Sequence, residues 1–277
     1  MPLLPILALV ASVNAPPTAA ALAGTVSVAY AGSLVRVMEG PLAEDLARDT
    51  GLQFAGEGKG SKALAQLIAG GVRRPDDFIS ADASLLEQLR RGPSPKLRGY
   101  ILFGSARMVV AYSPKSPYAA LFAQAIKEHR SLLPLLSNPS IKVGRTDPAL
   151  DPKGARTLKT LELLGKAEKA PVLASSLAAR SQVFPEEDLA VRVETGELDA
   201  GFFYSTEIPG RNLQTIELPA SANLSHDIVY GVAALSDAPH PQAAHAFLEY
   251  LLGPHGRAVL QSAGVRYFSK PRFFGTP

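Results

Sequence analysis

The alternation of short β-like runs with amphipathic helical runs is the feature that most narrows the possible fold. Val26–Ala29 predicts a first strand, residues 35–48 predict a helix with one apolar face, and similar pairs recur up to the C-terminal helices. This alternation is typical of α/β architectures with largely parallel sheets. With 277 residues, the chain is long enough to bury one or two sizeable cores. We therefore expect an α/β protein.

Two extended segments, at residues 100–112 and 227–235, are long for strands confined to one sheet. We interpret them as crossings between two lobes. On this interpretation, residues 24–107 and 225–277 form lobe 1, and residues 108–224 form lobe 2. In α/β lobes, ligands bind where strand ends and helix N-termini meet, so a ligand cleft is expected between the lobes.

The N-terminal residues 1–23 have the pattern of a signal peptide. A short apolar run, Leu3–Val13, is too short to span a bilayer and is followed by small residues, with Ala21-Leu22-Ala23 as a cleavage site. No Lys or Arg precedes the run, and a buried N-terminal element is the alternative interpretation. We expect an exported, periplasmic or extracellular protein whose mature chain starts near Gly24.

Charge and composition limit the classes of partner and chemistry. The chain has 28 basic and 25 acidic residues, a net charge of +3, and the basic residues are dispersed. This balance does not favour nucleic acid but is compatible with a small anion. There are no cysteines, which excludes disulfides, thiolate metal sites and cysteine nucleophiles.

Two Gly-Ser loops each precede a predicted helix. The first is Tyr30-Ala31-Gly32-Ser33-Leu34 and the second is Gly58-Lys59-Gly60-Ser61. A loop that opens a helix presents unpaired backbone N–H groups, a hydroxyl and the positive end of the helix dipole, which together can hold an anion. The alternative is that each serine is a simple N-cap.

Common enzyme motifs are missing from the sequence. The glycine-rich stretch at residues 56–61 is not a Walker loop, because Lys59 is followed by glycine. There is no G-x-S-x-G elbow, and the five histidines form no H-E-x-x-H pattern. We therefore predict a binding protein and not an enzyme.

Two further motifs complete a pattern that extends over the whole mature chain. Residues 147–154 read D-P-A-L-D-P-K-G, and residues 193–204 read V-E-T-G-E-L-D-A-G-F-F-Y. Together with the two Gly-Ser loops, in this order, the chain resembles the periplasmic molybdate/tungstate-binding proteins of ABC transporters. The resemblance implies a type II periplasmic binding protein fold and a monomer. It also implies delivery of the oxyanion to a membrane permease with its ATPase, without a cofactor.

The resemblance also implies a ligand site. Ser33 and Ser61 would each donate a hydroxyl and a backbone N–H to oxyanion oxygens, and Tyr204 would donate its phenolic hydroxyl. Backbone N–H groups near Lys153 and Glu186 would complete the shell. Many neutral donors can hold a dianion without a full counter-cation. For Tyr204 the alternative is a core tyrosine.

Asp151 is the ambiguous position. In the archaeal-type tungstate binders, the corresponding loop supplies a carboxylate to the metal, together with a glutamate from the strand before the tyrosine. This chain has Phe203 where that glutamate would stand, and in the bacterial-type binders the Asp151 position is apolar. Asp151 is thus a direct ligand of the oxyanion's metal centre, a turn residue before proline, or a carboxylate near a tetrahedral oxyanion that neutral donors hold. In the last case Arg145 or Arg156 would neutralise its charge.

Other functions stay open at this stage. The same cleft could hold sulfate, phosphate or a small organic anion. An enzyme built on the same fold and a sensory ligand-binding domain are further alternatives.

Overall fold

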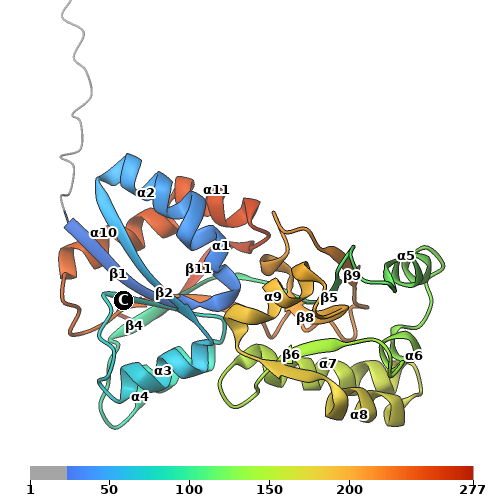
Figure 1. Ribbon diagram of the computed structural model, residues 1–277. Coiled ribbons are helices and arrows are strands. Elements are labelled where there is room, and N and C mark those ends of the chain that lie inside the picture. The colour runs from blue at the N-terminus through green and yellow to red at the C-terminus, as the bar shows by residue number, and fades with distance from the viewer. Residues whose placement is uncertain (1–23, 277) are drawn as a thin grey trace, which may run out of the picture.

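Two β-sheets, each flanked by helices, form two lobes that lie side by side in Figure 1. The computed structural model describes residues 24–276, so the predicted signal peptide lies outside the described residues. No helix among the described residues is long and apolar enough to cross a membrane. The expected two-lobe α/β architecture is confirmed.

The first sheet has the strand order β11-β4-β10-β3-β1-β2. Its strands are β1 (Gly24–Ala31), β2 (Leu52–Lys59), β3 (Asp77–Ser80), β4 (Gly99–Ser105), β10 (Val229–Ala234) and β11 (Arg266–Gly275). β1 pairs in parallel with β2 and β3, whereas β10 pairs antiparallel with β3 and β4. β11 also pairs antiparallel with β4.

Helices cover both faces of the first sheet (Figure 1). On one face lie α2 (Ala43–Thr50), α10 (Pro241–Leu252) and α11 (Pro254–Ser262), and on the other lie α3 (Ser61–Ala69) and α4 (Ala83–Arg91). Successive residues of β1 point to opposite faces of the sheet. Val28 packs in the core on the side of α2, α10 and α11, and Ala29 packs in the core on the side of α3 and α4. The period of two along a strand explains this division.

The second sheet has the order β7-β6-β8-β5-β9. Its strands are β5 (Met108–Tyr112), β6 (Val143–Thr146), β7 (Gln182–Phe184), β8 (Ala200–Tyr204) and β9 (Gln214–Glu217). The helices of this lobe are α5 (Ala119–Lys127), α6 (Leu132–Leu136), α7 (Pro152–Ala167), α8 (Pro171–Arg180) and α9 (Glu186–Thr195). Phe202 packs in the core that contains Leu161 of α7, and Phe203 packs in the core that contains Leu189 of α9.

The extended segment at residues 100–112 crosses between the sheets, as predicted. β4 belongs to the first sheet and β5, two residues later, to the second. The return crossing lies in residues 218–228, earlier than expected, and runs beside the first: the Met108 N–H donates to Asn223 O at 2.7 Å and the Ala106 N–H donates to Ile228 O at 3.1 Å. The segment at 227–235 is mainly β10, a strand of the first sheet alone.

Several details differ from the sequence-based expectations. Both sheets are mixed, because β5, β10 and β11 run antiparallel to their neighbours. The helix expected over residues 35–48 is broken at Gly40 (φ −112°, ψ −110°), which precedes Pro41. Proline removes a backbone donor and disfavours helical conformation in the residue before it. The strands β2, β7 and β11 and the helix α6 were not expected.

Candidate functional site

The first Gly-Ser loop lies at the contact between the lobes. β1 ends at Ala31 and a single 3-10 turn, η1 (Gly32–Leu34), follows. Ser33 is buried, and its Oγ lies 3.0 Å from the hydroxyl of Tyr230 on β10. That hydroxyl also lies 2.8 Å from Oγ1 of Thr206, which belongs to the second lobe. The Ser33 hydroxyl therefore belongs to a hydrogen-bonded chain that connects the two lobes.

The second Gly-Ser loop touches the opposite lobe directly. Gly60 is the N-cap of α3, and a β-carbon added there would lie 2.7 Å from the carbonyl oxygen of Leu150. The N–H of Ala63 donates to the same carbonyl at 3.0 Å. Ser61 is buried, and its Oγ accepts from the N–H of Ala81 at 3.2 Å. An oxygen used as an acceptor keeps its hydroxyl hydrogen for a further acceptor.

Asp151 is the N-cap of α7. Its Oδ1 accepts from the backbone N–H of Lys153 at 2.9 Å. Its Oδ2 is buried, and among residues 24–276 it has no hydrogen-bond partner. The turn interpretation of Asp151 thus accounts for one carboxylate oxygen only. The same bond occupies the Lys153 N–H that the resemblance assigns to the ligand.

The side chain of Lys153, which sequence reasoning did not consider, is fully buried between two carboxylates. Its Nζ lies 2.6 Å from Glu207 Oε1 and 3.4 Å from Glu186 Oε1. Burial acts to lower the pKa of Lys153, but the charges of Glu207, Glu186 and Asp151 outweigh it and raise the pKa above its ordinary value. Lys153 is therefore a permanent buried cation.

Glu186 is the first residue of α9, and its second oxygen is unused. Oε2 is buried, and no partner for it exists within the described part of the chain. Burial, followed by the charge of Asp151, raises the pKa of Glu186 well above its ordinary value, against the opposing effect of Lys153. A protonated Glu186 would offer an O–H donor at the N-terminus of α9, next to the backbone N–H groups of the first helical turn.

Tyr204, at the end of β8, is fully buried. Its hydroxyl oxygen accepts from Arg156 Nη1 at 3.0 Å, which leaves the hydroxyl hydrogen free to donate. Burial raises the pKa of Tyr204 well above its ordinary value despite the opposing charge of Arg156, so the phenol stays protonated. The Tyr204 backbone N–H donates to Glu207 Oε2 at 2.6 Å.

The structure brings all the predicted positions into one connected group. Gly32, before Ser33, lies against Glu186, and Gly60, before Ser61, lies against Asp151. Lys153 connects Glu186 with Glu207, which bonds Tyr204. The ionised group would contain four carboxylates and two cations: Asp82, Asp151, Glu186, Glu207, Lys153 and Arg156. Entry of a dianion into such a group favours a proton on one carboxyl.

Sequence reasoning missed four residues of this group. Glu207 and Thr206 follow Tyr204 in a turn where the Glu207 carboxylate accepts the Tyr204 N–H, and this three-residue spacing is the available sequence signal. Tyr230 and Asp82 are not part of such a spacing pattern. For Asp82 the available signal is its place after β3, because parallel-sheet proteins place polar site residues at the carboxyl ends of strands.

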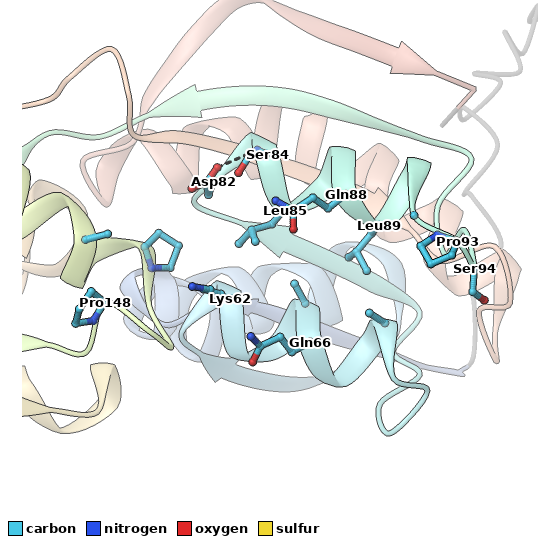
Figure 2. A pocket seen from close by; sticks show the side chains of 15 residues that line it. Lys62, Gln66, Asp82, Ser84, Leu85, Gln88, Leu89, Pro93, Ser94 and Pro148 are labelled. Carbon is cyan, nitrogen blue, oxygen red and sulfur yellow. Dashed lines mark hydrogen bonds between the residues drawn. The ribbon is translucent and has the colours of Figure 1, made fainter.

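A separate cavity opens beside this group. It has a volume of about 430 Å³ and lies between α3 and α4 of one lobe and the start of α7 of the other. Figure 2 shows Lys62 and Gln66 on one wall, with Asp82 and Gln88 on another. None of the six predicted site residues lines it. The predicted site is thus the packed interface next to this cavity.

Comparison with known proteins adds independent information. Residues 26–266 match the family described as "Bacterial extracellular solute-binding protein". A putative ABC transporter molybdenum-binding protein of Haloferax volcanii is 31% identical over 250 residues, covering 90% of this chain and 73% of that protein. A molybdate/tungstate-binding protein of Thermococcus kodakarensis is 24% identical over 303 residues, covering 91% and 82% of the two chains.

A solved structure shares the fold. The periplasmic molybdate-binding protein of Azotobacter vinelandii superposes with a TM-score of 0.69, at 20% identity, over 87% of this chain and 98% of its own. At this identity the likeness concerns the fold alone. It agrees with the two-lobe arrangement described above.

Proposed function

Because the chain belongs to the family of bacterial extracellular solute-binding proteins, we propose that it captures molybdate or tungstate between its lobes for an ABC transporter. The family makes it a binding protein for transport and not an enzyme. Two of its relatives carry names that specify molybdenum or molybdate and tungstate. A permease with its ATPase would receive the oxyanion.

The convergence of hydroxyl groups and helix N-termini at the lobe interface is the observation that carries this proposal. The hydroxyls of Ser33, Ser61 and Tyr204 come from both lobes and are buried at a contact that also contains the N-termini of α3, α7 and α9. Hydroxyl donors and helix N-termini are the groups that bind oxyanions without neutralising them fully. This supports Ser33, Ser61, Glu186 and Tyr204 as ligand-binding positions, whereas the Lys153 N–H already donates to Asp151 Oδ1.

Asp151 is proposed as a ligand of the metal centre itself. Its Oδ2 is buried and has no hydrogen-bond partner in the described part of the chain, while Oδ1 is fixed by the Lys153 N–H. An ionised carboxylate repels a dianion unless the metal accepts it as a ligand. X-ray absorption of the bound protein should therefore give more than four oxygen neighbours around the metal, and four would refute this role.

The remaining parts of the proposal concern the protein's context. Residues 24–107 with 225–277 and residues 108–224 would be the two lobes that open and close around the anion. Residues 1–23 would direct export, so that the mature protein acts outside the cytoplasm. It would act there as a monomer.

Calorimetry of the chain from Gly24 with molybdate, tungstate, sulfate and phosphate tests the function. We expect binding heat with molybdate or tungstate and far weaker binding of sulfate and phosphate. Tight binding of sulfate or phosphate alone would replace the proposed ligand with another oxyanion. No heat with molybdate or tungstate would refute the proposal.

A further inference from the structure

The side chain of Arg156, on α7, contacts both lobes and also a predicted ligand residue. Nη1 donates to the hydroxyl of Tyr204 in its own lobe at 3.0 Å. Nη2 lies 3.3 Å from Oδ2 of Asp82 in the other lobe. Nη2 also donates at 2.8 Å to the carbonyl oxygen of Asp227, in the return crossing.

Asp82 is a fixed partner for this guanidinium. It is the N-cap of α4, and its Oδ1 accepts from the Ser84 N–H at 2.9 Å, which Figure 2 draws as a dashed line. Oδ2 is thereby oriented toward Arg156. A planar guanidinium can donate to the Tyr204 hydroxyl, the Asp82 carboxylate and the Asp227 carbonyl in one fixed geometry. A lysine ammonium group cannot reproduce this geometry.

The bond to Tyr204 determines what the phenol can do. Arg156 occupies an acceptor position of the phenolic oxygen, so the O–H is available for an oxygen of the bound anion. A hydroxyl that accepts from a cation also becomes a stronger donor, because hydrogen bonds in a chain polarise one another. Arg156 therefore strengthens Tyr204 as a donor without needing to touch the anion.

We propose that Arg156 is a positioning residue that prepares Tyr204 to bind the oxyanion and, through Asp82, couples that binding to closure of the lobes. This inference rests on the proposed function, because it needs an anion that Tyr204 contacts. In the closed protein the anion, Tyr204, Arg156 and Asp82 form one continuous chain from lobe 2 to lobe 1. When the lobes separate, the Arg156–Asp82 contact breaks.

A double-mutant cycle on Arg156 and Tyr204 tests the positioning role. Calorimetry with molybdate should show roughly 30-fold weaker binding for Arg156→Met, and a loss of similar size for Tyr204→Phe. If Arg156 acts through Tyr204, the affinity of the double variant for molybdate should be at most about threefold below that of the single variant with the lower affinity. Losses that multiply would overturn the role, because Arg156 would then act independently of the phenol.

Further variants keep the test decisive if Arg156→Met folds poorly. Arg156→Lys keeps the charge but not the fork, and we expect roughly tenfold weaker binding; unchanged affinity would contradict the inference. Lys159→Met, on an exposed side chain of the same helix, is the matched control and should bind like the natural protein. Absence of molybdate binding by the natural protein would refute the proposed function instead, so the two failures are distinguishable.

The coupling to closure has its own measurement. Asp82→Asn should leave the Tyr204–Arg156 bond in place but weaken the link to lobe 1. Small-angle X-ray scattering at saturating molybdate should then show a larger radius of gyration for Asp82→Asn than for the natural protein. Equal radii would show that Arg156 does not hold the lobes together through Asp82.

Discussion

Gly32 and Glu186 approach each other so closely across the lobe interface that a side chain at position 32 would displace the Glu186 carboxyl group. A β-carbon there would lie 2.6 Å from Glu186 Oε2 and 2.8 Å from its Cδ. The glycine of the first Gly-Ser loop thus leaves room for a buried carboxyl group of the opposite lobe. This close approach between the loop and the first residue of α9 is favoured by the missing side chain.

Gly32→Ala should hinder closure more than folding. The added methyl collides with a buried carboxylate of the other lobe, so we expect roughly tenfold weaker molybdate binding and little change in the melting temperature of the ligand-free protein. Calorimetry and thermal unfolding measure the two effects. Gly24→Ala, where the nearest atom would lie 4.0 Å away, is the control. Unchanged affinity of Gly32→Ala would show that the lobes close differently with ligand.

Ser33→Ala and Ser61→Ala should each weaken oxyanion binding by about 1.5–3 kcal/mol, the range for hydrogen bonds to charged groups. Both hydroxyls are buried, and each would lose a donor to the dianion. Calorimetry with molybdate measures the change. Ser94→Ala, at an exposed position in the neighbouring cavity, should have no effect. If both variants bind normally, the serines are simple structural residues.

Binding should weaken as pH rises through the raised pKa of Glu186, because its carboxyl group must hold a proton to donate to the anion. Burial and the charge of Asp151 raise its pKa, and a dianion nearby would raise it further. The neutral form donates to the anion, whereas the ionised form repels it, so affinity is highest at the lower pH. Calorimetry across pH should show this loss for the natural protein and a flatter profile for Glu186→Gln. Parallel profiles would exclude Glu186 as the titrating group.

Asp77→Asn should stabilise the protein at pH values above the folded-state pKa of Asp77. Asp77 is fully buried, and neither carboxylate oxygen has a partner among residues 24–276. Burial, then the charge of Asp76, raises its pKa in the folded state. Protonated Asp77 therefore contributes stability that is fully present below the unfolded-state pKa of this carboxyl group. This stability is lost as pH rises through its folded-state pKa.

Thermal unfolding across pH measures this effect. Above the folded-state pKa of Asp77 we expect a gain of about 1 kcal/mol in unfolding free energy for Asp77→Asn, and this gain should vanish as pH falls below that pKa. Asp76→Asn is the contrasting control, because Asp76 accepts bonds from Ser27 and His240 and its replacement should destabilise. A gain for Asp77→Asn that is equal at all pH values would point to packing and not to ionisation.

Local pattern predicted much of the architecture. The crossing at residues 100–112 and the helices α8, α10 and α11 are contiguous apolar or amphipathic runs, whose structure depends on nearby residues. The strands β2 and β11 could not be read in this way. β2 contains three polar or charged residues and two glycines, and β11 contains Pro271, so both form because long neighbouring strands pair with them at sheet edges.

The candidate site likewise contains parts that local sequence patterns predicted and parts that they could not predict. The two Gly-Ser loops, the D-P-x-x-D-P-K-G turn and the strand ending in Tyr204 could be predicted from sequence, because each is a short segment with its own local chemistry. Three contacts became visible only in the folded protein: Lys153 lies between Glu186 and Glu207, Gly32 meets Glu186, and Arg156 joins Tyr204 to Asp82. The first contact joins three elements of one lobe, and the other two join the two lobes. All depend on how segments far apart in the sequence pack together, which no local pattern encodes.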